Sequence, residues 1–121
     1  MKIASLWRLE GEELELKPEL ERCHDPELKQ RLLGFLRGGG LVLHATALRQ
    51  DRLDPSRPRA VPLGYLSDGE WIWPLEMTYY LEQHGILPQE EFQAYMRARN
   101  YEADEPPAEV LAAAAQMLTG E

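Results

Sequence analysis

The stretch that decides the fold is residues 61–85, VPLGYLSDGEWIWPLEMTYYLEQHG. Two runs of aliphatic and aromatic residues flank the turn-forming triplet 67–69, Ser-Asp-Gly, and this arrangement predicts a β-hairpin. Pro74 suits the first turn of a helix, and Gly85 suits its end. The stretch therefore predicts two antiparallel strands followed directly by a helix.

The chain before this stretch predicts further strands. Residues 2–9 mix apolar and polar side chains as a strand does, and Leu14 and Leu16 alternate with glutamates, so that a first hairpin is expected here. The apolar run at 41–50, LVLHATALRQ, contains β-branched residues and predicts a buried strand. Residues 51–59, DRLDPSRPR, are rich in turn formers and predict an exposed loop.

Three more helices are indicated by their end signals and spacing. Asp25 is a good N-cap for a helix that begins at Pro26, and the three glycines at 38–40 end it. Pro88 opens a helix with apolar residues at helical spacing, and an alanine-rich helix is expected at about 107–118.

These elements predict an α+β fold with a small antiparallel sheet of about four to five strands, packed with three to four helices. A length of 121 residues fits one domain, residues 1–121, and the apolar fraction of 44% is typical of a globular protein. No segment approaches the ~20 apolar residues that span a bilayer, so that no membrane association is expected. The lone Cys23 cannot form an intramolecular disulfide, which fits a reducing, cytoplasmic location.

The charge is large and unevenly placed. A net charge of −8 disfavours direct binding to duplex nucleic acid, because such binding depends on Lys and Arg at the phosphates. Eleven acidic residues lie between residue 60 and the C-terminus against only Arg97 and Arg99, whereas residues 49–59 hold four arginines against two aspartates. The acidic excess either serves solubility alone or steers the chain toward a cationic protein partner.

Half of the ten aromatic residues lie within positions 65–80. In the second strand of the predicted hairpin Trp71 and Trp73 share one face and Ile72 lies on the other, because side chains alternate. The tryptophan face either receives the helices as core or lines a surface groove, since both roles suit Trp and Tyr. The candidate binding residues are Tyr65, Asp68, Glu70, Trp71, Trp73, Glu76 and Tyr80.

The segment from Gly64 to Gly85 carries a tyrosine, an Asp-Gly turn, Trp-x-Trp-Pro, a Tyr-Tyr pair and His-Gly. In this order they resemble a pattern found in small uncharacterised bacterial proteins. The resemblance covers less than a fifth of the chain. Some proteins of this kind are discussed as immunity-like partners of toxins, which implies protein binding and assigns no catalytic residue.

Catalytic and metal chemistry is weakly signalled. Asp68, Glu70 and Glu76 could act as acid and base on a sugar stacked against tryptophan. Each is equally explained by the turn, by an exposed strand position or by the first turn of a helix. Cys23 and His24 supply one adjacent pair of ligands, so that no metal or other cofactor is expected.

The leading hypothesis is therefore a non-catalytic acidic protein that docks on another, basic, protein. Two alternatives remain open at this point. One is a small enzyme that acts on a carbohydrate or another small molecule at the aromatic cleft. The other is a subunit of a larger assembly, held by the arginine loop and the last helix.

Overall fold

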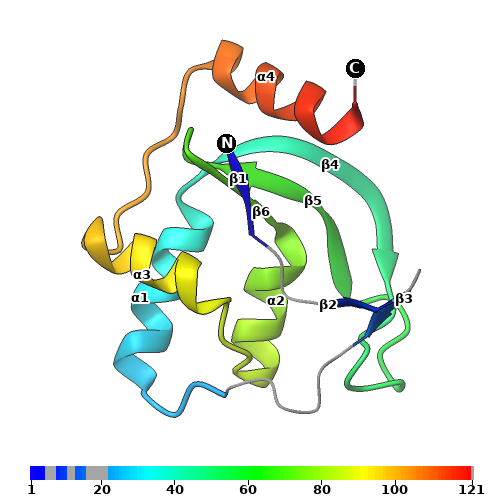
Figure 1. Ribbon diagram of the computed structural model, residues 1–121. Helices are drawn as coiled ribbons and strands as arrows, with labels where there is room; N and C mark the ends of the chain where they lie inside the picture. Colours follow the sequence, from blue (N-terminus) through cyan, green and yellow to red (C-terminus); the bar gives the residue numbers. More distant parts are fainter. Residues whose placement is uncertain (5–7, 11–12, 16–21, 121) are drawn as a thin grey trace.

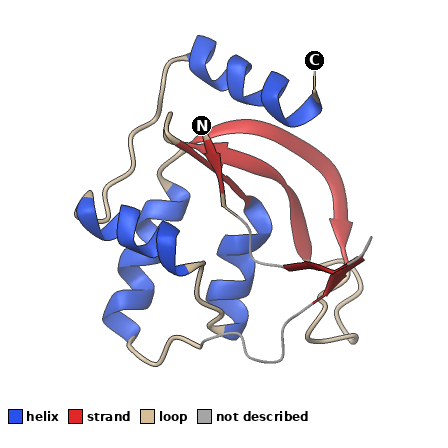
Figure 2. Ribbon diagram, viewed as in Figure 1, coloured by secondary structure: helices blue, strands red, loops and turns tan. Residues whose placement is uncertain are grey.

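The computed structural model describes residues 1–4, 8–10, 13–15 and 22–120. Within these residues it contains four helices, a four-stranded sheet and a separate two-stranded sheet, so that the predicted α+β class is confirmed (Figure 2). The strands are β1 (Lys2–Ile3), β2 (Arg8–Glu10), β3 (Glu13–Glu15), β4 (Gly40–Arg49), β5 (Val61–Ser67) and β6 (Trp71–Pro74). The helices are α1 (Pro26–Arg37), α2 (Leu75–His84), α3 (Glu90–Ala98) and α4 (Ala108–Thr119).

The main sheet has the strand order β1-β6-β5-β4. The predicted hairpin is confirmed, because β5 and β6 pair antiparallel with Ser67 opposite Ile72. Strand β1 lies parallel to β6, with Lys2 opposite Trp71, and makes the sheet mixed instead of purely antiparallel. The parallel pairing joins segments nearly 70 residues apart, and no local turn signal could have predicted it.

The first predicted hairpin corresponds to β2 and β3, which pair antiparallel with Leu9 opposite Leu14. The single strand expected at residues 2–9 is divided between β1 and β2. Residues 5–7, 11–12 and Leu16 lie outside the described residues, so that this part of the prediction is not tested further.

Both ends of α1 and the C-terminal end of α2 follow the predicted signals, whereas α2 and α3 begin one and two residues after the prolines that were predicted to open them. Asp25 caps α1, because its Oδ1 accepts hydrogen bonds from the backbone N–H groups of Glu27 (3.0 Å) and Leu28 (3.4 Å). Gly85 ends α2 in the left-handed conformation with φ = 69°, which glycine adopts without strain. None of the helices in the described part of the chain is both long and apolar enough to cross a membrane.

The core lies between β6 and the helices α1, α2 and α3, which gather on one side of the sheet (Figure 1). Trp73 is fully buried, and its ring centroid lies 5.4 Å from Phe35 of α1 and 5.6 Å from Phe92 of α3. Its indole N–H donates a hydrogen bond to the carbonyl of Leu36 (3.0 Å). The tryptophan face of the hairpin is therefore the surface that receives the helices.

The prediction of a strand at residues 41–50 is confirmed, but the prediction that this strand is buried is wrong. Strand β4 is present, but every residue from His44 to Arg49 is exposed. Helix α4 lies along β4, apart from the other three helices, and buries only Ala114 (Figure 1). An apolar run predicts a strand by its propensity, whereas its burial depends on a covering layer that comes from elsewhere in the chain.

The backbone conformation and the close packing at position 64 require glycine. Its φ is +150°, and a Cβ atom built there would lie 2.4 Å from the carbonyl oxygen of Leu43 in the neighbouring strand. We therefore expect Gly64→Ala to lower the free energy of unfolding by about 1–3 kcal/mol. Gly34→Ala is the matched control: apart from the adjacent residues and the backbone of α1 itself, no atom lies within 4 Å of the added methyl group, so that it should raise stability by up to about 1 kcal/mol. Urea denaturation of both variants tests this, and changes of the same sign would contradict it.

Candidate functional site

The turn between β5 and β6 holds Asp68 firmly. Its Oδ1 accepts hydrogen bonds from the backbone N–H groups of Glu70 (3.0 Å) and Trp71 (2.9 Å). The neighbouring Ser67 Oγ accepts from the N–H of Gly69 (3.0 Å) and donates to the carbonyl of Trp71 (2.7 Å). The aspartate is thus buried as part of the turn, as its position in the Ser-Asp-Gly triplet predicts.

Tyr95 of α3 joins the two carboxylates of this turn. Its hydroxyl lies within hydrogen-bond distance of Asp68 Oδ2 and of Glu70 Oε2, the latter at 2.7 Å. Burial, together with these two carboxylates, raises the pKa of Tyr95 above its ordinary value, because an ionised phenol here would lose solvation and face negative charge. The phenol therefore stays protonated and donates its single hydrogen to one carboxylate at a time.

Arg99, one helical turn after Tyr95, lies among three carboxylates. Its Nη1 binds Glu70 at 3.0 Å, its Nη2 binds Asp104 at 3.2 Å, and its Nε lies 3.9 Å from Asp68 Oδ2. The guanidinium also lies 5.4 Å from the ring centre of Tyr95. One cation thus neutralises only part of the negative charge at this end of the sheet.

The aromatic residues predicted to form a recognition surface are mostly buried. Trp71 is 4% exposed and stacks on Phe92 with ring centroids 4.9 Å apart, and Trp73 is fully buried. Tyr80 is 1% exposed, and its hydroxyl accepts a hydrogen bond from the backbone N–H of Arg52 (2.9 Å). These three side chains hold the fold together beneath the surface and do not themselves present a docking face in this conformation.

Tyr65 and Glu76 lie elsewhere, in an open cavity of about 480 Å³. The cavity is formed by β4, β5, the end of β6 and the first turn of α2. Its lining residues are Leu43, His44, Ala45, Arg49, Pro62, Leu63, Gly64, Tyr65, Pro74 and Glu76. Asp68 and Glu70 are not among them, so that the structure does not bring together at this cavity the carboxylate pair that the enzyme hypothesis requires.

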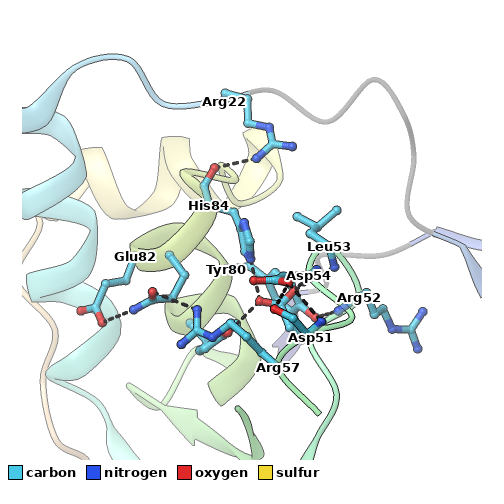
Figure 3. Close-up of polar contacts among 12 residues, drawn as sticks. Arg22, Asp51, Arg52, Leu53, Asp54, Arg57, Tyr80, Glu82 and His84 are labelled. Atoms are coloured by element: carbon cyan, nitrogen blue, oxygen red, sulfur yellow. Dashed lines mark hydrogen bonds and ion pairs between the residues drawn. The ribbon is translucent and has the colours of Figure 1, made fainter. Parts of the chain in front are cut away.

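A third group of polar residues was not singled out by the sequence. Asp51, in the loop after β4, is completely buried. Its Oδ2 accepts a hydrogen bond from the hydroxyl of Tyr79 on α2 (2.7 Å). The same oxygen lies 2.6 Å from Nε2 of His84 at the end of α2 (Figure 3). Its Oδ1 accepts from the backbone N–H groups of Leu53 (2.8 Å) and Asp54 (3.1 Å). This one carboxylate therefore fixes the loop at residues 51–59, the arginine-rich loop, to the end of α2.

The electrostatics of Asp51 follow from these contacts. Burial by itself would raise its pKa, but the hydrogen bonds from His84, Tyr79 and Leu53 outweigh burial and hold the pKa of Asp51 below its ordinary value. Burial and the same carboxylate raise the pKa of Tyr79 to about 12. Asp51 is therefore an ionised acceptor, and every described contact of its side chain stabilises the loop.

The arginine side chains at this loop are oriented outward, whereas its aspartates are not. Asp51 points inward, and Asp54 Oδ1 accepts from the backbone N–H (3.1 Å) and the hydroxyl (2.5 Å) of Ser56. Arg49 and Arg59 are exposed, whereas Arg57 lies 5.4 Å from the ring centre of Tyr79 and binds Gln83 (3.2 Å). The loop is thus a cationic patch on an acidic protein.

The seven candidate residues fall into three places: the turn network beside Tyr95, the cavity, and the buried core with its link to the arginine-rich loop. Tyr95 and Arg99 were missed, although their i, i+4 spacing placed them on one helical face. Asp51 and His84 were missed because their contact joins residues 33 positions apart. In the described part of the chain, no three His, Cys, Asp or Glu side chains are grouped so as to hold a metal ion.

Comparison with known proteins adds no relative to these observations. No family model, no curated protein and no solved structure matches this chain.

Proposed function

We propose that this chain is a non-catalytic binding protein that docks on a cationic surface of another protein. The observation that carries the proposal is the convergence of acidic side chains from three segments: the β5–β6 turn, the linker between α3 and α4, and the first turn of α4. The exposed acidic residues of these segments are Glu70, Glu102, Asp104, Glu105 and Glu109. They are called the acidic face below.

The contacts of the described residues support the continuity of the acidic face. Gly69 of the turn lies close to Pro106 and Val110, since a Cβ atom at Gly69 would be 3.6 and 3.9 Å from their side chains. Arg99 ties Glu70 to Asp104 across the same region. The side chains of Glu70 and Asp104 nevertheless remain 62% and 79% exposed. Their charges are therefore available to a partner.

The shape of the acidic face favours a protein over a small ligand. Its members lie on a turn, a linker and a helix start, and the cavity that contains Tyr65 and Glu76 lies elsewhere, between β4, β5 and α2. Complementary charge at such a surface accelerates and orients association. A basic toxin or nuclease is the kind of partner that the resemblance to immunity-like proteins implies. In this proposal Trp71 and Trp73 support the acidic face from within.

The test compares two variants of equal charge change. Glu102→Gln with Glu109→Gln removes two charges of the acidic face, whereas Glu27→Gln with Glu82→Gln removes two from α1 and α2, where exposed ion pairs contribute little stability. Proteins captured by the tagged wild-type chain from its own cell extract are identified and purified, and their affinities for the three forms are measured. We expect the first variant to bind about tenfold more weakly and the second to bind like the wild type. Equal affinity of all three forms, or equal losses in both variants, would contradict the proposal.

A further inference from the structure

Strand β4 carries an exposed apolar surface. Leu41 and Leu48 are 53% and 49% exposed, and no Asp, Glu, Lys or Arg occurs from Gly40 to Leu48. Proteins usually protect the edge of a sheet with charged side chains or proline, or cover it. In the described part of the chain β4 is the last strand of its sheet and has neither charge nor proline before Arg49. Helix α4 lies along β4 but leaves both leucines exposed, so that a second surface over them would remove this exposure.

The two ends of β4 carry opposite charge. At its start, Glu105 of the acidic face lies against Gly40, because a Cβ atom at Gly40 would be 3.2 Å from Glu105 Cγ. At its end stands Arg49, followed by the arginine-rich loop, which lies at the opposite end of the β4–β5 hairpin from the β5–β6 turn (Figure 1). Their partners on β5, Ser67 and Val61, are six residues apart, so that these ends are separated by about 20 Å. Neither Arg49 nor Glu105 forms an ion pair with any residue in the described ranges.

The charges and leucines along β4 complement those of a second copy whose β4 runs in the opposite direction. If two copies lie side by side with their β4 strands antiparallel, Arg49 of each copy meets Glu105 of the other. The same superposition places Leu41 of each copy opposite Leu48 of the other, because both pairs are symmetric about the middle of the strand. One two-fold symmetric arrangement therefore pairs the opposite charges and also buries the leucines. An isologous interface has this property, because the same surface of each copy contacts the other.

We propose that β4 is the interface of a two-fold symmetric dimer of this chain, with Arg49 of each copy paired with Glu105 of the other. The contact is made by side chains and not by one continuous backbone ladder. Strand β4 has register shifts against β5 between Leu41 and Leu43 and between Ala45 and Leu48, and such bulges bend an edge away from regular pairing. The interface is small, so that self-association is expected at micromolar or higher concentration.

Sedimentation velocity and light scattering over a range from low micromolar to near-millimolar protein test the proposal. The wild type should show a monomer–dimer equilibrium, whereas Arg49→Glu and Glu105→Arg should each weaken dimerisation at least about tenfold, because each places like charges together twice. An equimolar mixture of the two single variants should dimerise like the wild type, since every contact then joins opposite charges. The double variant should also recover.

The controls separate this interface from a general effect of charge. Arg97→Glu and Glu90→Arg make the same charge changes at exposed positions on α3, and each should dimerise within about threefold of the wild type. Circular dichroism confirms that each variant is folded, and the neutral changes Arg49→Gln and Glu105→Gln provide milder substitutions at the same positions. A wild-type chain that stays monomeric, or a mixture of single variants that does not recover, overturns the proposal.

Discussion

Replacing Asp51 by alanine is expected to lower the free energy of unfolding by about 3–5 kcal/mol, because four groups that it binds lose their acceptor in a buried site. Two of them are the side chains of Tyr79 and His84, and two are backbone N–H groups of the arginine-rich loop. Asp51→Asn keeps one oxygen acceptor and should cost about half as much. Urea denaturation followed by tryptophan fluorescence measures both changes.

The same residue makes a defined contribution to the pH dependence of stability. In the folded chain the pKa of Asp51 lies below its ordinary value of 3.8. As the pH falls, Asp51 is therefore protonated in the unfolded chain before it is protonated in the folded chain. Its stabilising effect is therefore complete at pH values above the ordinary aspartate pKa and is lost as the pH falls through the lower folded value. In Asp51→Asn the free energy of unfolding should therefore fall less steeply than in the wild type as the pH decreases below about 4.

Asp54→Ala is the control for Asp51, since Asp54 lies in the same loop and its side chain is hydrogen-bonded only to Ser56 among the described residues. Its cost should be about 1 kcal/mol or less. If the two alanine variants were equally stable, the anchoring role assigned to Asp51 would be wrong.

Replacing Trp73 by alanine is expected to cost about 3–5 kcal/mol, because a large side chain with no exposed surface leaves a cavity between α1, α3 and the sheet. The change also leaves the carbonyl of Leu36 without its hydrogen bond from the indole. Trp73→Phe keeps part of the ring contacts and should cost about half as much. Thermal and urea unfolding measure these losses.

Met117→Ala is the control for Trp73, because Met117 is 46% exposed and its truncation should change stability by less than about 0.5 kcal/mol. The comparison also separates the two roles considered for the tryptophans. A docking residue on the surface could be removed without loss of stability, whereas a core residue could not. A fully stable Trp73→Ala variant would contradict the core position.

The hairpin, the helix after it and the N-cap of α1 could be predicted from the sequence because their signals are local. A Ser-Asp-Gly triplet favours a turn wherever it stands, Asp25 can cap the N–H groups that follow it, and Gly85 can end a helix without strain. The candidate site was predictable to a lesser degree. Asp68 and Glu70 were recognised as neighbours in sequence, but the Tyr95 that joins them could not be.

The sequence by itself determined the α+β class, the β5–β6 hairpin, both ends of α1 and the C-terminal end of α2. Only the tertiary structure decided that the tryptophans are core, that β4 is exposed, and that β1 lies parallel to β6. It alone brought Asp51 to His84 and Glu105 to Gly40. The physical reason is that turns and caps depend on backbone conformation within a few residues. Burial and ion pairing, by contrast, depend on which distant segment packs against a given face.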